Sequence, residues 1–200
     1  DDVYKIKNED RRIGGRDYLF LGDEVSNYDL LALALVASDN TAISALVSSV
    51  GLDGETFIDM MNKRARVLGL RNTFFNDPTG LSSKNVSTAR EVSFLIKEAL
   101  EIEIIANLVN KKEYKLTTKQ GRARSVVSTN ELLYTNGNNS IEIIGGKTCY
   151  IESSGYCLGT KFLLNNSQEF ISVILNASTL KNRFADTSEI FKSLYDLYNN

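Results

Sequence analysis

Three runs rich in β-branched and aromatic residues follow one another near the end of the chain and limit the class of fold. They are Ile141–Ile151, Tyr156–Leu164 and Glu169–Ala177, separated by short polar turns. Strands joined by such short turns pair antiparallel with their neighbours. An amphipathic stretch from Thr179 to about Tyr198 follows and predicts a helix. The sequence therefore predicts an antiparallel sheet with a closing C-terminal helix.

The earlier part of the chain has the pattern of helices. Leu30–Val36 is apolar on every side, which predicts a helix buried in the middle of a lobe. Further helices are expected at Thr41–Val50, at Glu55–Leu68 and from Ser87 to about Leu100. The 200 residues are enough for one substantial core. We therefore predict an α+β fold in a single domain, residues 1–200, with a mainly helical lobe at 18–112 and the sheet with its helix at 113–200.

The first strand of the predicted sheet carries a Lys–Thr pair beside two glycines. Gly145 and Gly146 directly precede Lys147 and Thr148. Glycine inside a strand marks the close approach of another backbone or of a ligand. A Lys ammonium beside a Thr hydroxyl supplies a point charge and a hydrogen-bond donor, which together suit an anion. Taken alone, the pair also fits an ordinary solvated strand face.

A second polar group, Ser38-Asp39-Asn40, lies between the buried helix and the next one. Asn40 is predicted to be the N-cap of the helix that begins at Thr41, because its side chain can accept a hydrogen bond from the first turn. A bend between two packed helices presents short polar side chains from a rigid position.

The absence of histidine restricts the chemistry. It excludes Ser-His-Asp and Cys-His catalysis. Two cysteines without histidine do not make a closed zinc site, so we expect no metal and no cofactor. Acid–base chemistry near neutral pH then falls to Lys, Tyr, Asp or Glu with a shifted pKa.

The distribution of charge and of apolar residues narrows the list of partners. The net charge is −2, with both signs interspersed and no basic stripe, so nucleic acid is not an expected partner. No stretch approaches ~18 uninterrupted apolar residues, so no membrane span is expected. The chain starts with Asp1-Asp2 and shows no signal peptide, as a mature chain or a fragment would.

Ser-x-Asn followed much later by Gly-x-Lys-Thr resembles the penicillin-recognising serine enzymes of the β-lactamase-like superfamily. Within them the chain is most similar to the serine-type D-alanyl-D-alanine carboxypeptidases, the low-molecular-mass penicillin-binding proteins. The likeness runs from about Tyr18 to Leu197. The segments that carry it, in the family's order, are Leu21–Val25, Val36–Ala42, Met61–Ala65, Leu68–Phe75, Pro78–Leu81, Ser87–Glu91, Asn130–Leu133 and the Lys147-Thr148 hairpin.

This resemblance implies a function. Members of the family remove the terminal D-alanine from peptidoglycan stem peptides through an acyl-enzyme on a serine. By resemblance, Ser38 relays a proton to the leaving amine and Asn40 binds the substrate amide. Lys147 and Thr148 bind the substrate carboxylate, and the backbone N–H of Tyr150 forms half of an oxyanion hole. The implied partners are D-Ala-D-Ala stem peptides and β-lactams, and the implied location is the cell envelope, outside the cytoplasm.

The chain departs from the family in its nucleophile motif. The family's Ser-x-x-Lys precedes Ser-x-Asn, and none lies in Asp1–Ala37. Ser178-Thr179-Leu180-Lys181 has the spacing but stands in the wrong order, as a chance match would. We expect the family's N-terminal strands and nucleophile to be missing and the chain to be inactive alone. The missing part would then be an N-terminal segment or a partner chain.

Two alternatives stay open. The chain is also compatible with a non-catalytic module that binds D-Ala-D-Ala peptides or peptidoglycan. The chain also resembles the class A β-lactamases, which share the sequence motif Ser38–Ala42. Those enzymes, however, carry a catalytic Glu in an acidic loop where this chain has Asp77–Leu81.

Cys149 is the second departure, since the family has Gly there. Alternation along the strand puts Cys149 on the same face as Lys147, where a thiol narrows the substrate-binding site or acts as a nucleophile. If the hairpin turn is centred on Ser153, Cys149 opposes Cys157 and Tyr150 opposes Tyr156. Such a pair fits either two free buried thiols or a strained cross-strand disulfide.

Overall fold

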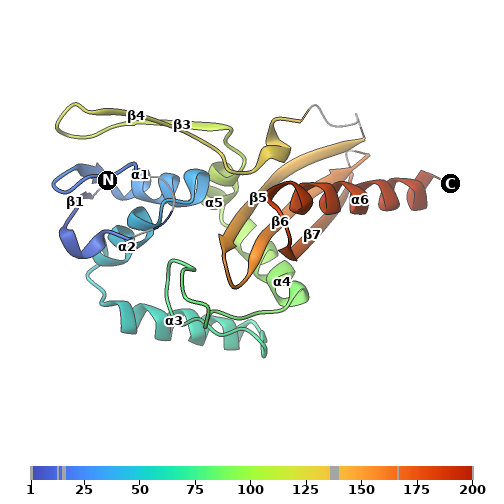
Figure 1. Ribbon diagram of the computed structural model, residues 1–200, viewed down its shortest axis with the longest axis horizontal. Helices are drawn as coiled ribbons and strands as arrows, with labels where there is room; N and C mark the ends of the chain where they lie inside the picture. The colour runs from blue at the N-terminus through green and yellow to red at the C-terminus, as the bar shows by residue number, and fades with distance from the viewer. Residues whose placement is uncertain (1, 13, 15–16, 136–139, 166, 200) are drawn as a thin grey trace. The chain divides into compact units, whose positions relative to one another are not determined.

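The computed structural model describes most of the chain, namely residues 2–12, 14, 17–135, 140–165 and 167–199. The chain forms two compact units, and each unit is assembled from two separate stretches. The first unit is Asp1–Val86 with Glu113–Ser128, and the second is Ser87–Lys112 with Thr129–Asn200 (Figure 1). The Ser-x-Asn segment therefore belongs to the first unit and the Lys-Thr strand to the second.

The first unit contains helices and two small antiparallel sheets of two strands each. Its elements in chain order are β1 (Val3–Lys5), the 3₁₀ turn η1 (Asn8–Asp10), β2 (Glu24–Ser26), α1 (Asn27–Ala32), the π-helical turn η2 (Leu33–Ala37), α2 (Asn40–Ser49), α3 (Gly54–Val67), β3 (Glu113–Thr117) and β4 (Ala123–Val127). Strand β1 pairs with β2, and β3 pairs with β4. Strands β2 and β4 were not predicted, because each is short, and β2 in addition has its partner β1 in a distant part of the chain.

The buried helix predicted over Leu30–Val36 is confirmed. Leu30 and Leu33 have no exposed surface, and Val36 has almost none. The same apolar cluster includes Leu116 and Val126, so the β3–β4 hairpin contributes to this core. Burying a large aliphatic side chain stabilises by about 1.5–3 kcal/mol, which makes this cluster the anchor for the bend that follows it.

The N-termini of α1 and α2 are each capped by a side chain. Ser26 caps α1 through a capping box with Asp29. The prediction that Asn40 caps α2 is wrong, because Asp39 is the N-cap and its Oδ1 accepts from the Ala42 N–H at 2.9 Å. An N-cap needs a non-helical backbone, which Asp39 has (φ −76°, ψ 113°), whereas Asn40 is already the first helical residue.

The second unit is a three-stranded antiparallel sheet between helices. It contains α4 (Ala89–Leu100), α5 (Glu103–Val109), the short 3₁₀ turn η3 (Glu131–Leu133), β5 (Ile141–Ile151), β6 (Gly155–Leu164), β7 (Gln168–Ala177) and α6 (Leu180–Asn199). The strand order is β5-β6-β7 (Figure 1). The three predicted strands and the closing helix are confirmed, as is the α+β class. No helix in the described ranges has the length and apolar character needed to cross a bilayer.

Both faces of this sheet are covered. Helix α6 packs on one face, where the rings of Phe162 and Phe191 lie 4.3 Å apart. Helix α4 packs on the other, since a Cβ added to Gly159 would meet Ile96 Cδ1 at 2.1 Å. Alternation puts Phe162 and Gly159 on opposite faces, in agreement with these contacts.

The predicted register of the β5–β6 hairpin is also confirmed. Cys149 pairs with Cys157, and Tyr150 pairs with Tyr156. On its other side β6 is less regular: Tyr156 pairs with Ala177 but Leu158 pairs with Ile174, which leaves one extra β7 residue opposite Cys157. This is a β-bulge close to the end of the sheet that carries Lys147.

Candidate functional site

Ser38 sits at a corner built by an unusual helix end. Helix α1 widens into the π-helical turn Leu33–Ala37, and Ser38 then takes a left-handed backbone conformation (φ 57°, ψ 41°). Single π-turns occur often at functional sites, and a non-glycine residue in the left-handed region costs of order 1 kcal/mol or more. The buried cluster beneath the turn holds this conformation in place, so Ser38 is presented from a fixed corner.

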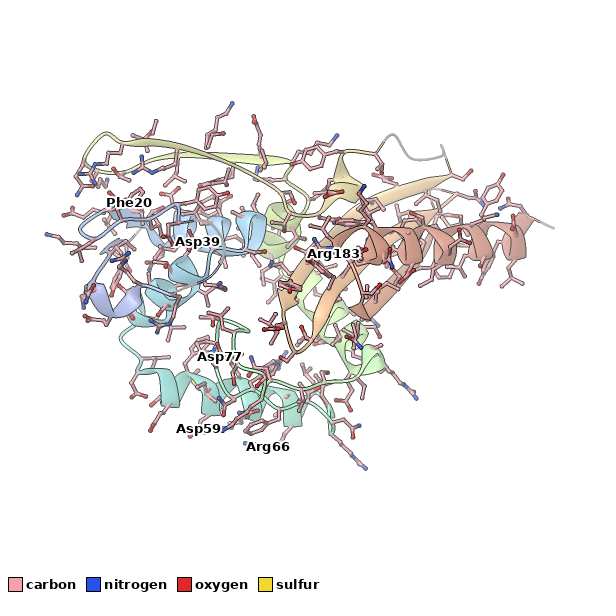
Figure 2. All side chains as sticks on the ribbon, in the orientation of Figure 1. Phe20, Asp39, Asp59, Arg66, Asp77 and Arg183 are labelled. Atoms are coloured by element: carbon pink, nitrogen blue, oxygen red, sulfur yellow. The ribbon has the colours of Figure 1, made fainter. Side chains whose placement is uncertain are left out.

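Asp39 secures the same corner from inside. Its carboxylate accepts hydrogen bonds from the backbone N–H groups of Ala42 and of Tyr18, the latter at 3.3 Å (Figure 2). Desolvation raises the pKa of this buried carboxyl, and the hydrogen bonds from Ala42 and Tyr18 partly offset that rise. Asp39 thus ties two segments to the Ser-x-Asn bend, while Ser38 and Asn40 remain at its surface.

Asn40 is bounded by two other segments of the first unit. Its Nδ2 donates to the Gly14 carbonyl at 3.3 Å. A Cβ placed on Gly14 would lie 3.7 Å from Leu81 Cδ2 and 3.8 Å from Asn40 Nδ2. Leu81 and Asn40 therefore flank the same glycine, and the turn that contains Leu81 lies beside the Ser-x-Asn motif.

That turn is organised by the Asp77 carboxylate. The carboxylate accepts from Thr79 N at 2.9 Å, from Ser82 N at 3.0 Å and from Asn85 Nδ2 at 2.8 Å. The Thr79 hydroxyl and the Gly80 N–H also donate to it. The sequence predicted a turn here from composition alone, whereas the structure shows one side chain holding the whole segment.

The same segment is fastened to α3 by Asn62. Asn62 Nδ2 donates to the Phe75 carbonyl at 2.7 Å, and its Oδ1 accepts from the Phe75 N–H at 2.8 Å. A side-chain amide that satisfies both backbone groups of one residue replaces a missing strand partner. Asn62 thus fastens this segment to α3, a role that sequence reasoning did not assign.

In the second unit, Lys147 is half-buried on β5. Its Nζ donates to the Thr148 carbonyl at 2.9 Å. Burial lowers the pKa of Lys147, Cys149 acts in the opposite direction and the charge of Arg183 adds to the lowering, so that the pKa is about 8. At neutral pH most of the ammonium is still protonated, so it can bind an anion.

The glycines beside Lys147 are required by packing. A Cβ on Gly146 would lie 2.5 Å from the Gly159 carbonyl oxygen, and one on Gly145 would lie 2.6 Å from Val109 Cγ2. Real Cβ atoms do not approach this closely. The close neighbour expected from the glycines is therefore the adjacent strand for Gly146 and helix α5 for Gly145, and these contacts fix the position of the Lys147 strand.

Thr148 lies on the opposite face of β5 from Lys147. Its buried hydroxyl shares a hydrogen bond of 2.5 Å with the Thr129 hydroxyl. Thr129 was not identified from the sequence, because nothing in its local pattern indicates that it lies beside the strand. The structure brings together Lys147, Thr148, Cys149 and Tyr150 on one strand, and Ser38 and Asn40 at one bend, each set within its own unit.

Arg183 is a further residue that sequence reasoning missed. This α6 side chain is almost fully buried, and its Nη1 donates to the Cys149 carbonyl at 3.3 Å (Figure 2). Its guanidinium lies 5.6 Å from the Tyr156 ring centre and 4.8 Å from that of Phe184. Tyr156 in turn stacks on Tyr150 at 4.2 Å. Because the Cys149 carbonyl and the Tyr150 N–H belong to one planar peptide, Arg183 holds the plane of that peptide.

Substituting Arg183 by Ala is expected to lower the free energy of unfolding by about 2 kcal/mol, from a lost charged hydrogen bond and buried cation–π contacts. Arg183→Lys keeps the charge but loses the planar stacking, so an intermediate loss is expected. Urea unfolding measures both. The exposed α6 residue Lys192 provides a control, since Lys192→Ala removes a cation without these contacts. A loss no larger than that of Lys192→Ala would contradict the role given to Arg183.

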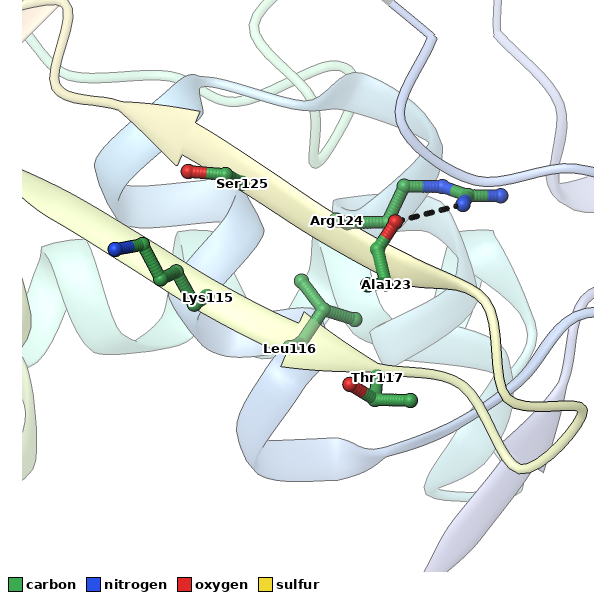
Figure 3. Close-up of a pocket in the computed structure, with 6 residues that line it drawn as sticks. All are labelled: Lys115, Leu116, Thr117, Ala123, Arg124 and Ser125. Carbon is green, nitrogen blue, oxygen red and sulfur yellow. Dashed lines mark hydrogen bonds between the residues drawn. The ribbon is translucent and has the colours of Figure 1, made fainter.

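A surface pocket lies elsewhere, on the β3–β4 hairpin of the first unit. Six residues line it: Lys115, Leu116, Thr117, Ala123, Arg124 and Ser125 (Figure 3). Arg124 Nη1 donates to the neighbouring Ala123 carbonyl at 3.0 Å. None of the six is a predicted site residue, so the pocket adds nothing to the strand that carries Lys147.

The fold, with its sheet, closing helix and ordered motifs, is that of the DD-transpeptidases. The crystal structure of the Streptomyces K15 DD-transpeptidase matches with a TM-score of 0.82 at 25% identity, covering 96% of this chain and 78% of that one. The chain belongs to the D-alanyl-D-alanine carboxypeptidase family, whose pattern matches residues 2–179.

Curated relatives agree with this assignment. The chain is 33% identical over 171 residues to the D-alanyl-D-alanine endopeptidase of Escherichia coli (strain K12), covering 85% of this chain and 54% of that protein. It is 30% identical over 186 residues to the D-alanyl-D-alanine carboxypeptidase DacF of Bacillus subtilis (strain 168), covering 92% and 46%. The chain thus spans about half the length of the curated relatives it matches.

Proposed function

We propose that this chain supplies the substrate-binding part of a serine-type D-Ala-D-Ala carboxypeptidase that acts on peptidoglycan stem peptides in the cell envelope. The observation that carries the proposal is Lys147: a half-buried ammonium, charged at neutral pH, on a strand fixed by two glycine contacts. A carboxylate is the anion at the end of a stem peptide. Membership of the family supports the choice of this anion over others.

Each candidate residue has a role in this proposal. The Lys147 ammonium binds the C-terminal carboxylate of the peptide, and the Thr148 hydroxyl, bonded to Thr129 on the opposite face of β5, holds the strand that carries this ammonium. The Tyr150 N–H donates to the oxygen of the scissile carbonyl, in a peptide whose plane Arg183 holds. Asn40 binds the substrate amide. Ser38 passes a proton to the leaving D-alanine amine.

Binding is the direct test of this proposal. A diacetylated L-Lys-D-Ala-D-Ala peptide, titrated calorimetrically into the 200-residue chain, is expected to bind reversibly. The same peptide with an amidated C-terminus lacks the carboxylate and serves as the control, for which much weaker binding is expected. Equal binding of both peptides, or no binding of the free acid at millimolar concentration, would count against the proposal.

We also propose that the 200-residue chain does not form an acyl-enzyme by itself, because no Ser-x-x-Lys precedes Ser38 in it. Incubation with a fluorescent penicillin is expected to leave no label that survives denaturation, while a family member with an upstream Ser-x-x-Lys is labelled under the same conditions. A covalent label on this chain would overturn the prediction. Peptide mapping would then show whether the acylated residue is a serine or Cys149.

A further inference from the structure

Two cysteines face each other across the hairpin that carries Lys147. Cys149 on β5 and Cys157 on β6 are paired residues of one antiparallel ladder, and both are free thiols. Paired residues in such a ladder have Cα atoms about 4.5 or 5.5 Å apart, depending on the type of pair. Disulfides accept Cα separations of about 4.4–6.8 Å. The register therefore places the two Cα atoms within the range that disulfides accept, with both side chains on one face of the sheet.

The sheet around Cys157 has room to adjust. The β7 bulge lies opposite Cys157, and Asn176 within it has a left-handed backbone (φ 59°). The Cys157 thiol makes only weak contacts, with its Sγ 3.6 Å from the Ser154 carbonyl and 3.9 Å from that of Gly155. Rotation of this side chain toward Cys149 would break only these weak contacts. At this residue β6 has a regular hydrogen-bonded ladder with β5 but not with β7.

The two thiols differ in access. Cys149 is exposed, so a small reagent can reach it, whereas Cys157 is half-buried. Desolvation raises the pKa of the Cys149 thiol, and the positive charge of Lys147, two residues away on the same face, opposes that rise. The accessible cysteine is thus also the one whose raised pKa a neighbouring cation partly lowers, which increases the fraction of thiolate, the form that reacts with disulfides.

We propose that Cys149 and Cys157 form a dithiol–disulfide pair that is oxidised by low-molecular-mass disulfides. The Cys149 thiolate attacks one sulfur of the reagent RSSR, which forms a mixed disulfide at Cys149 and releases one RSH. The Cys157 thiolate then attacks the Cys149 sulfur, which forms the cross-strand bond and releases a second RSH. Two electrons pass from the pair to the reagent, and the two thiol protons leave on the two RSH molecules.

The bridge would change the strand next to the candidate anion site. It would tie β5 to β6 two residues after Lys147 and remove the thiol that faces the same side as the ammonium. The disulfide would close only a short loop within one hairpin, so its effect on global stability is small and its effect is local to this strand. Cross-strand bridges of this kind are strained, which makes them easy to reduce.

Oxidised glutathione and the intact 200-residue chain test the proposal. After incubation, intact-mass analysis is expected to show the loss of two hydrogens without an added glutathione, and peptide mapping to show a Cys149–Cys157 cross-link. Dithiothreitol should restore the starting mass. Accumulation of a glutathione adduct at Cys149 without the cross-link, or oxidation only to covalent dimers, would overturn the proposal.

Two variants separate the steps. Cys157→Ser is expected to stop at a stable mixed disulfide on Cys149, and Cys149→Ser to react much more slowly because only the half-buried thiol remains. Phenylarsine oxide needs two adjacent thiols for tight binding. It should bind to the native folded chain in a one-to-one ratio and should not bind to either variant. Circular dichroism of each variant confirms that it is folded. Binding of the arsenical by either single-cysteine variant at the native level would contradict the assigned pair.

Discussion

Replacing Lys147 by Ala is expected to weaken the binding of a D-Ala-D-Ala peptide by about 10- to 100-fold. A hydrogen bond from a charged group contributes about 1.5–3 kcal/mol, and each 1.4 kcal/mol corresponds to a factor of ten in affinity. The expected loss is near the upper end, because the Lys147 ammonium is half-buried and its strand is fixed by the packing of Gly145 and Gly146. Titration calorimetry with the free-acid peptide measures it.

Lys161 provides a matched control. It lies on β6, on the same face of the same sheet, and its Nζ forms an ion pair with Glu169 at 2.9 Å. Lys161→Ala also removes a partly buried lysine, so it accounts for any general effect of lost charge. Its affinity for the peptide should stay within about twofold of the native value. If both variants lose affinity equally, or if Lys147→Ala binds as the native chain does, Lys147 does not bind the carboxylate.

The same affinity should depend on pH through one group. Burial, together with the charge of Arg183, lowers the pKa of Lys147 to about 8 despite the opposing effect of Cys149. The protonated form binds the carboxylate, so affinity should be steady at pH 6–7 and fall by about tenfold per pH unit well above 8. Lys147→Arg should remove this fall, because a guanidinium stays charged throughout the range. A native profile that is flat to pH 9.5 would contradict the assignment.

The strands of the second unit were predictable because the signals that specify them are local. Ile141–Ile151 and its two successors are runs of β-branched and aromatic residues between short turns, and the position of the turn near Ser153 determined the pairing of Cys149 with Cys157. The buried helix over Leu30–Val36 was equally clear, since it is apolar on every side. In each case the pattern and the turn chemistry fall within a few residues of one another.

The parts that could not be predicted depend on contacts between distant segments. Strand β2 exists because Glu24–Ser26 meets Val3–Lys5, and Asp39 rather than Asn40 caps α2 because its backbone is extended at the end of a π-turn. Thr129 and Arg183 contribute to the Lys147 strand from positions 19 and 34 residues away from their partners. No periodicity in the sequence marks such residues. The motifs of the site could therefore be predicted, but the residues that hold those motifs in place could not.

Replacing Asp77 by Ala is expected to lower the free energy of unfolding at pH 7 by about 3–4 kcal/mol. The Asp77 carboxylate accepts hydrogen bonds from Thr79, Ser82 and Asn85, and all of these bonds are lost when the carboxylate is removed. Leu81 lies in the same turn and flanks Gly14 opposite Asn40, so the segment beside the Ser-x-Asn motif should also become disordered. Urea unfolding measures the stability, and hydrogen exchange of the Gly80–Ser82 amides measures the local effect.

The pH dependence and a matched control make this last prediction specific. Although desolvation raises the pKa of Asp77, the hydrogen bonds from Thr79 and Ser82 outweigh it and hold the pKa below its usual value of 3.8. A carboxyl whose pKa is lowered by folding stabilises the protein above the unfolded-state pKa, and this stabilisation is lost as the pH falls through the folded-state value. The difference in unfolding free energy between the native chain and Asp77→Ala should therefore shrink below about pH 4.

Asp59→Ala, which removes an exposed carboxylate on α3, provides the control and should lower the unfolding free energy by less than about 0.5 kcal/mol at either pH (Figure 2). A cost for Asp77→Ala that is equally small at pH 7 would mean that the turn is held by its other contacts, with Asn62 and Asn85 as the next residues to test.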